Sequence, residues 1–295
     1  MEVMRLNSEC MNCLLTHQLG KTPADVSEEK RVDYMQRVLR ILSEANKQDS
    51  APVIVRSIYR LQKEMFGMET DYTEIKRYYN QRMLEKAVSI EQGIEAREDP
   101  LKCAIQYAMT GNYIDFAALH TVEEDKLDVL LHKAEENLID EETYAALKQD
   151  LERAGRLVYL TDNCGEIVLD KLLLKVIEKL YPEIQVTVIV RGGPVANDAT
   201  MEDAVQTGLT DMAHVIGNGN DVGGTWLEGL SQAAGEALDQ ADVVISKGQG
   251  NFETLQGCGL NIYYIFMCKC SMFTKRFHVK QFDGILINDR KCREF

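Results

Sequence analysis

The sequence predicts an α/β protein in which a helical N-terminal region precedes a Rossmann-like, mostly parallel sheet with helices on both faces. Two observations support this prediction. Apolar residues recur at helical spacing over the first half of the chain, whereas short β-rich runs alternate with helical patterns from about residue 156 onwards. Strands that alternate with helices are typical of a parallel sheet covered by helices. We therefore expect two regions, residues 1–155 and residues 156–295.

The first region reads as a series of helices. Ser27-Glu28-Glu29 is a typical helix start, Gly67 is a typical helix end, and the pair Asp99-Pro100 breaks one helical pattern and restarts the next. Further helical stretches cover about residues 122–138 and 141–154. Two arrangements remain open, because these helices can form an independent domain or pack on the sheet.

The second region contains six β-rich runs, most of them separated by helical patterns. The runs are residues 157–161, 186–190, 214–216, 243–246, 262–267 and 285–287. In an open parallel sheet the carboxyl ends of the strands lie along one edge, and ligands bind there. Side chains that follow different strands can therefore meet in one crevice.

Composition narrows the possible functions. The chain has 295 residues, of which 45% are hydrophobic and 27% charged, as in an ordinary globular protein. With 47 acidic and 33 basic residues its net charge is -14, which argues against nucleic acid or an anionic membrane as a partner. No run of 18 apolar residues and no secretory signal is visible. The eight cysteines are scattered too widely for a disulfide scaffold, so we expect a cytoplasmic protein.

The most informative stretch is residues 156–166, in which an apolar run ends in a polar turn that leads into a helical pattern. Asp162, Asn163 and Glu166 therefore lie at the carboxyl end of a strand and the start of a helix. Two carboxylates and an amide oxygen within five residues form an oxygen-rich site, which suits Mg²⁺ or Mn²⁺ better than a soft metal. Helix capping by Asp162 or Asn163 explains the same residues equally well.

Polar residues also follow two other predicted strands. Arg191 comes directly after the second run, and Asp198 lies further along the same loop, where it can also cap the next helix. Lys247 and Gly248 follow the fourth run. A glycine-rich turn lets backbone amides approach a ligand, and lysine supplies a compact positive charge for phosphate. This turn has neither the dinucleotide fingerprint nor the P-loop spacing.

Together these strand ends can supply the parts of a metal-assisted phosphatase. Asp162, Asn163 and Asp198 provide oxygens for a divalent cation, while Arg191 or Lys247 faces the phosphate. A bound cation polarises a phosphoryl oxygen and lowers the pKa of a water molecule. A positive side chain offsets the charge that builds up during transfer.

At these positions the sequence resembles the damage-control phosphatases, also called acidic-residue methyltransferase-like proteins and formerly domain of unknown function 89. The matching segments are residues 162–166, 197–204 and 247–253. Residues 111–116 and the early Cys10-Met11-Asn12-Cys13 resemble the prokaryotic branch of this family that carries a Cys-x-x-Cys pair. The resemblance covers nearly the whole chain.

The resemblance implies a divalent-metal-dependent phosphomonoester hydrolase whose substrates are phosphorylated small metabolites, such as sugar phosphates or damaged derivatives. Mg²⁺, Mn²⁺, Co²⁺ or Ni²⁺ would bind to Asp162, Asn163 and Asp198, and Lys247 would complete the catalytic set near the phosphate. Residues 156–295 would then form a metal- and phosphate-binding domain. The residues expected to contact the substrate are Gly165, Glu166, Arg191, Asn197, Gly248 and Asn251.

Cys10 and Cys13 have three interpretations. A Cys-x-x-Cys pair can hold a second metal ion, but a structural zinc site usually needs four ligands, and Cys268 and Cys270 do not have the usual zinc spacing. A redox pair is expected beside a βαβ unit, whereas this pair lies in a helical context. Buried structural thiols are the third interpretation.

Two other functions remain open. Rossmann-like folds also host nucleotide-cofactor enzymes, such as an S-adenosylmethionine-dependent carboxyl methyltransferase, and the fold alone does not decide between chemistries. Such an enzyme needs an acid on the ribose, and no glycine fingerprint precedes a suitable acid here. A non-catalytic metal- or metabolite-binding protein would use the same crevice without turnover.

Overall fold

The computed structural model describes residues 6–46, 48–67, 71–119 and 122–293. The chain divides into two compact units, Glu2–Asp71 and Tyr72–Phe295, and each unit has a hydrophobic core of its own. This division lies earlier in the chain than the change of composition near Gly155, because the helices that follow Tyr72 bury their apolar residues in the same core as the sheet.

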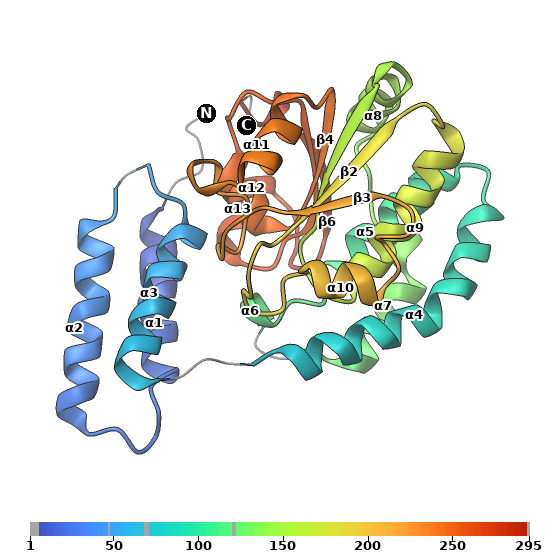
Figure 1. Ribbon diagram of the computed structural model, residues 1–295. Helices are drawn as coiled ribbons and strands as arrows, with labels where there is room; N and C mark the ends of the chain where they lie inside the picture. The colour runs from blue at the N-terminus through green and yellow to red at the C-terminus, as the bar shows by residue number, and fades with distance from the viewer. Residues whose placement is uncertain (1–5, 47, 68–70, 120–121, 294–295) are drawn as a thin grey trace. The chain divides into compact units, whose positions relative to one another are not determined.

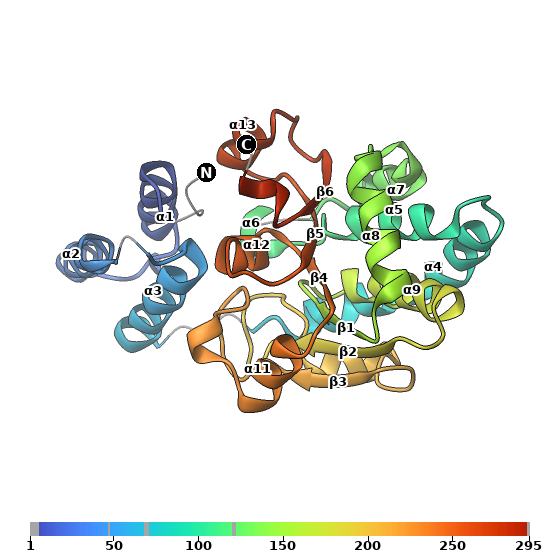
Figure 2. The ribbon, with the colours of Figure 1, turned by 90° about the horizontal axis from the view of Figure 1, so that it is seen from above.

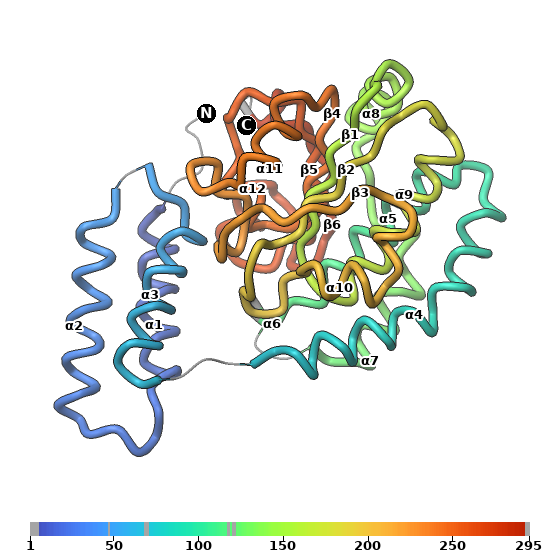
Figure 3. Tube along the Cα trace, viewed as in Figure 1, coloured from blue at the N-terminus to red at the C-terminus, as the bar shows by residue number. Residues whose placement is uncertain are grey.

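The first unit consists of three helices, α1 (Ser8–Gly20), α2 (Glu28–Glu44) and α3 (Ala51–Phe66) (Figure 3). The side chain of Ser27 accepts a hydrogen bond from the backbone of Lys30 and caps α2, as its sequence predicts. Gly67 ends α3 in the left-handed region, with φ 64°. The core of this unit is formed by Tyr34, Val38, Leu42, Ile54, Ile58 and Leu61.

The second unit is built around a six-stranded sheet with the order β3-β2-β1-β4-β5-β6 (Figure 1). All neighbouring strands are parallel except β5 and β6, which are antiparallel. The strands are β1 (Arg156–Leu160), β2 (Gln185–Val190), β3 (His214–Gly217), β4 (Val243–Lys247), β5 (Ile262–Met267) and β6 (Gly284–Asn288). Each predicted strand is confirmed to within two residues.

Helices cover both faces of this sheet, which confirms the predicted fold class. Figure 2 shows α4, α5, α7, α8 and α9 on one face and α11, α12 and α13 on the other. The helices of this unit are α4 (Thr73–Glu95), α5 (Pro100–Gly111), α6 (Phe116–Leu119), α7 (Glu124–His132), α8 (Glu141–Arg153), α9 (Glu166–Leu180), α10 (Met201–Gln206), α11 (Gln232–Asp239), α12 (Gln249–Leu255) and α13 (Ser271–Phe277), with short 3-10 helices at Ala134–Glu136, Leu227–Gly229 and Lys291–Arg293. No helix in the described part of the chain is long and apolar enough to cross a membrane.

The helical stretch expected over residues 122–138 is shorter than the pattern predicts. The α-helix ends at His132, and a 3-10 turn follows. Gln106 on α5 donates from its side-chain amide to the backbone carbonyls of Glu135 and Asn137, at 2.8 Å each. These tertiary hydrogen bonds hold the segment against α5, where a continued α-helix would use the same carbonyls internally.

The strand order reverses its direction at β1, which lies between β2 and β4. The register places Leu160 beside Ile189 on one side and beside Ser246 on the other. The residues that follow these three positions therefore emerge together at the carboxyl edge of the sheet. Open α/β sheets bind ligands at such a switch point.

Candidate active site

Backbone hydrogen bonds bring the loop after β2 back onto the turn after β1. Ala199 donates to the carbonyl of Asp162 at 2.7 Å, and Cys164 donates to the carbonyl of Asn197 at 2.8 Å. Asn163 and Asp198 form an isolated antiparallel bridge between these contacts. The structure thus brings together Asp162, Asn163 and Asp198, the three predicted metal ligands.

The guanidinium of Arg191 joins the two carboxylates. Its Nε donates to Oδ2 of Asp198 at 2.6 Å, and one of its terminal nitrogens donates to Oδ1 of Asp162 at 3.3 Å. The other terminal nitrogen donates to Oδ1 of Asn251 at 3.1 Å. Because the Arg191 guanidinium contacts both carboxylates, the carboxylates of Asp162 and Asp198 lie close to each other.

Gly248 forms the floor beneath Asp162. Its φ of +82° lies in the left-handed region, and a Cβ atom at this position would lie 2.0 Å from Oδ2 of Asp162. Only glycine lets the backbone after β4 approach this carboxylate so closely. The predicted role of the glycine-rich turn therefore has a steric basis, although the group that approaches is a carboxylate of the protein itself.

Burial raises the pKa of both carboxyl groups. The pKa of Asp162 lies well above its usual range because of desolvation, and the neighbouring charges of Asp198 and Glu166 raise it further. The pKa of Asp198 is raised mainly by burial, while the guanidinium of Arg191 opposes the shift. A site with two carboxylates in little solvent favours the binding of a positive ion or of protons.

The donor set fits a hard divalent cation. Asp198 contacts Arg191 through Oδ2 alone, and Oδ1 of Asn163 accepts no hydrogen bond from any residue that the structure describes. Carboxylate and amide oxygens are suitable ligands for Mg²⁺ or Mn²⁺. No group of three or more His, Cys, Asp or Glu side chains within the described ranges is arranged to hold a metal ion. The third donor here is an amide, which is not one of those side-chain types.

Lys247 occupies a different place from the one expected. Its side chain is fully buried, and Nζ donates to the carbonyl of Ala108 at 2.8 Å, to Glu166 at 2.6 Å and to Asp170 at 2.7 Å. An ammonium group has three N–H donors, so these partners use its full capacity. Because its partners belong to α5 and α9, Lys247 lies on the face of β4 that packs against these helices, behind the carboxylates.

Four other predicted substrate residues use their polar groups within the protein. The Glu166 carboxylate is fully buried, and the Gly165 amide donates to Oδ1 of Asn80 at 2.6 Å. Asn197 holds the segment around Ile114 through its side-chain amide at 3.0 Å, and Asn251 donates to the carbonyl of Lys247 at 2.7 Å. In this structure these residues hold the loops of the site in place through hydrogen bonds within the protein.

The structure adds Lys269, which the predicted set omits, and brings Asp115, from the segment 111–116 that resembles the family, to the same place. Lys269 follows β5 and is 5% exposed, and its Nζ lies 2.6 Å from Oδ2 of Asp115. Its positive charge lowers the pKa of Asp162, and the negative charge of Asp115 raises that of Asp198. Both side chains therefore act electrostatically on the metal-ligand candidates. The same strand-end argument that selects Arg191 applies to Lys269, but its position between Cys268 and Cys270 favours an interpretation based on thiols.

The eight cysteines are thiols and form no disulfide bond in the described part of the chain. Cys268 is buried and Cys270 is exposed. On α1, the Sγ atom of Cys13 lies 3.7 Å from Nε2 of His17, while Cys10 is half-buried. A second metal ion at Cys10 and Cys13 stays a prediction.

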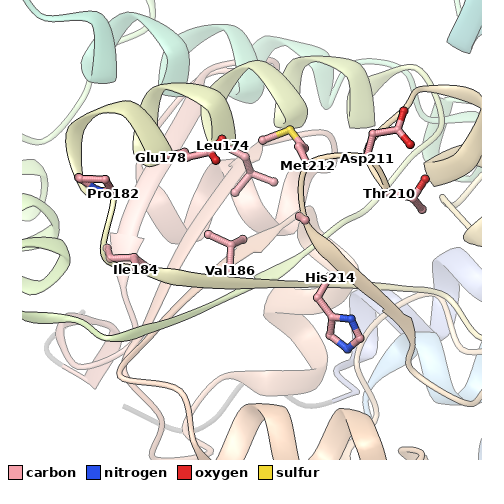
Figure 4. Close-up of a pocket in the computed structure, with 10 residues that line it drawn as sticks. Leu174, Glu178, Pro182, Ile184, Val186, Thr210, Asp211, Met212 and His214 are labelled. Atoms are coloured by element: carbon pink, nitrogen blue, oxygen red, sulfur yellow. The ribbon is translucent and has the colours of Figure 1, made fainter.

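A cavity of about 320 Å³ lies at the opposite, amino-terminal edge of the sheet. Figure 4 shows Leu174, Ile184 and Val186 on its walls, with Glu178 and His214 at its margin. It contains none of the strand-end residues described above, so the chemistry at the carboxyl edge and this cavity are separate features.

The chain is similar to known proteins over nearly its whole length. Residues 6–285 match the family model described as the damage-control phosphatase ARMT1-like domain. The chain is 30% identical to a damage-control phosphatase from Archaeoglobus fulgidus, over 90% of this chain and 93% of that protein. It is 27% identical to damage-control phosphatase PH1575 from Pyrococcus horikoshii, over 94% and 95%. The crystal structure of PH1575, described as a DUF89 family protein, is similar with a TM-score of 0.79 and 25% identity, and covers 97% of this chain and 99% of that one.

Proposed function

The chain belongs to the damage-control phosphatase ARMT1-like family, and from this premise we propose that it is a divalent-metal-dependent phosphatase of phosphorylated small metabolites, such as sugar phosphates or their damaged derivatives. The observation that supports this proposal best is the convergence of Asp162, Asn163 and Asp198 at the switch point of the sheet. Metal-assisted phosphate hydrolysis uses oxygen ligands for a cation close to positive groups for the phosphate, and these strand ends would supply both.

Asp162, Asn163 and Asp198 would hold the cation, which would be Mg²⁺, Mn²⁺, Co²⁺ or Ni²⁺. When bound, such an ion polarises a phosphoryl oxygen and lowers the pKa of a water molecule. The protein fixes the three ligands through the backbone bridge between the turn after β1 and the loop after β2. The positive charge of Arg191 reduces the repulsion between the two carboxylates, so that an anionic substrate can approach them.

Arg191 and Lys269 supply the positive charge that faces the phosphate. Both follow strands at the carboxyl edge, and the positive charge of each lowers the pKa of Asp162, against the larger effect of burial. Lys247 is bound by three acceptors and has no N–H group left for a phosphate oxygen. The contact between Lys269 and Asp115 holds the ammonium group at 2.6 Å from a carboxylate, where it is oriented before substrate arrives.

The test is release of inorganic phosphate from a generic phosphomonoester with each of the four metal ions, compared with EDTA. Replacement of either carboxylate, in Asp162→Ala and Asp198→Ala, is expected to reduce the metal-dependent rate by at least about 100-fold. Asp211→Ala is the matched control, because Asp211 is an exposed aspartate at the opposite edge of the sheet. Phosphate release that continues unchanged in EDTA or in both site variants would contradict the proposal.

The same assay separates the alternative functions. Carboxylates fill the turn after β1, where a nucleotide-cofactor enzyme would carry its glycine fingerprint. A thermal shift with S-adenosylmethionine, without any phosphate release, would favour such an enzyme. Stabilisation by Mn²⁺ without turnover on a panel of phosphometabolites would favour a binding protein, whereas release from particular members of that panel identifies the substrate class.

A further inference from the structure

Four polar side chains form a buried cluster directly behind the proposed metal site. Tyr159, Glu166, Asp170 and Lys247 are all fully buried. Lys247 Nζ joins Oε1 of Glu166 at 2.6 Å and Oδ1 of Asp170 at 2.7 Å, and the Tyr159 hydroxyl donates to the same Asp170 oxygen at 2.7 Å. Charged groups without water are costly to bury and weak sources of stability, so their presence calls for another explanation.

The cluster reaches the metal-ligand candidates through Glu166. Its Oε2 accepts hydrogen bonds from the backbone N–H of Asn163 at 3.2 Å and from Nδ2 of the same residue at 2.9 Å. Asn112 Nδ2 lies between Oδ2 of Asp162 and the two carboxylate oxygens of Glu166, at 3.0 to 3.1 Å. Glu166 thus contacts the candidate ligand Asn163 directly and reaches the candidate ligand Asp162 through Asn112.

These contacts decide which way the Asn163 amide faces. Its Nδ2 donates to Oε2 of Glu166 and to Oδ2 of Asp162, at 2.9 and 2.7 Å. The reversed amide would place its oxygen against two carboxylate oxygens, which only accept hydrogen bonds. The amide nitrogen therefore faces the carboxylates of Glu166 and Asp162, and the amide oxygen is the atom left for a cation.

We propose that Glu166 is a positioning residue that turns the Asn163 amide so that its oxygen faces the metal, and that Lys247, held by Asp170 and Ala108, keeps Glu166 in place. This inference rests on the proposed function, since it requires the cation at Asp162, Asn163 and Asp198. It gives Lys247 a role in cation binding at a distance from the phosphate. Residues that orient metal ligands in this way typically change metal affinity roughly 10–100-fold when they are replaced.

The experiment measures Mn²⁺ affinity by calorimetry in wild type, Glu166→Gln, Asn163→Asp and the double variant. In the wild-type Asn163 background, Glu166→Gln places an N–H donor against the Asn163 amide, and we expect the Kd to rise about 10–100-fold. In the Asn163→Asp background the Glu166 carboxylate faces a second carboxylate, at position 163. Glu166→Gln then replaces the Glu166 carboxylate by an amide that donates a hydrogen bond to it. There we expect Glu166→Gln to lower the Kd.

This reversal separates positioning from simple electrostatics. Loss of one negative charge near the cation weakens binding in both backgrounds. A Kd that rises in both, or that does not change in a folded Glu166→Gln protein, would overturn the inference. If wild type itself binds no Mn²⁺, the proposed metal site fails, and this outcome is distinct from a wild type that binds while the variants show no reversal. If Glu166→Gln does not fold, comparison of Asn163→Asp with the double variant carries the test.

Tyr159→Phe is the matched control for stability alone. It removes one hydrogen bond at the far end of the cluster, and Asp170 keeps its contact with Lys247. We expect a lower melting temperature of the metal-free protein but a Kd for Mn²⁺ within about 3-fold of wild type, since the Glu166 contacts remain. A Kd change as large as that of Glu166→Gln would show that any loss of core stability weakens the site, and would overturn a specific positioning role.

Discussion

The two edges of the sheet carry the same kinds of residue in opposite environments. At the carboxyl edge Asp162, Arg191 and Lys247 are 6%, 2% and 0% exposed, and each is bound to partners of opposite charge. At the amino edge Arg156 and His214 are exposed to solvent. Stability alone favours the second arrangement, because solvated charges need no partners.

The difference shows where the fold is shaped for ligand binding. Buried charges at the carboxyl edge come with glycines that leave no room for a side chain, such as Gly248 against Asp162 and Gly192 against Gly219. The amino edge instead has an open cavity whose lining contains both apolar and polar residues. A cluster of charges that is costly to bury and sterically constrained is a better indicator of a functional site than a hollow.

The largest expected effect at the carboxyl edge comes from Gly248→Ala. The added methyl group cannot coexist with the present position of the Asp162 carboxylate. We expect phosphate release to fall by about 100-fold or more, since a displacement of about 1 Å in a reacting group has effects of this order. Gly259→Ala is the control: its φ is +95° but no atom lies within 4 Å of the new Cβ, so only backbone strain of about 1 kcal/mol is expected. Similar activity in the two variants would remove the steric argument.

A pair of arginines compares the edges directly. Arg191→Gln breaks a buried ionic contact with two carboxylates and is expected to lower the free energy of unfolding of the metal-free protein by about 3–5 kcal/mol. Arg156→Gln changes an exposed side chain and should stay within about 0.5 kcal/mol of wild type. Urea unfolding measures both. Equal effects would mean that the burial of Arg191 has no energetic consequence.

The pH dependence of metal binding gives a smaller effect. The pKa values of Asp162 and Asp198 are raised in the metal-free fold, so the folded state binds protons more tightly than the unfolded chain. Stability from the neutral carboxyls is present at low pH and is lost as pH rises towards the raised pKa, whereas a cation binds the ionised forms. The rise in melting temperature caused by Mn²⁺ should therefore be larger at about pH 7.5 than at about pH 5.5.

At about 100 times its Kd a ligand stabilises the fold by about 2.7 kcal/mol, or roughly 5–10 °C for a unit of this size. We expect this shift at the higher pH in wild type and a much smaller one in Asp162→Asn, measured by thermal unfolding with and without Mn²⁺. A shift of equal size at both pH values would contradict a role for the two raised pKa values.

The smallest effect is expected at the amino edge. His214→Ala changes a side chain at the margin of the cavity, on the far side of the sheet from the strand ends. We expect phosphate release within about 2-fold of wild type, because surface substitutions away from the site have little effect. Strong loss of turnover in this variant, with normal folding, would show that the cavity takes part in the reaction.

Some of the site is predictable from local patterns. The apolar run before Asp162 and the helical spacing after it identify a strand, a turn and a helix. The carboxyl ends of parallel strands meet at one edge, so the sequence alone predicts that Asp162, Asn163, Asp198 and Arg191 lie together. Lys269 is accessible to the same reasoning, but the cysteines on either side of it suggest a different chemistry.

The face towards which Lys247 points is not predictable. Every residue of β4 is buried, so the strand has no alternation of polar and apolar residues to distinguish its two faces. Likewise, Glu166 and Asp170 are one turn apart on α9, but their shared partner comes from a residue 77 to 81 positions away. The compact units divide near Tyr72 and not at the change of composition near Gly155, because helical periodicity shows which face of a helix is apolar but not what that face packs against.

The sequence by itself determined the α/β class, the order of strands and helices, and the polar residues that end the strands, since periodicity and turn chemistry are local properties. The tertiary structure decided which side chains those residues bind and which face of the sheet they occupy. Strand order, register and burial bring Asp162 and Asp198 into contact with the guanidinium of Arg191 and place Lys269 near them. Lys247 instead points towards α9, where it binds Glu166 and Asp170. The contacts of Lys247 and Lys269 join positions far apart in the chain, and periodicity along the sequence does not show which side chains those residues bind.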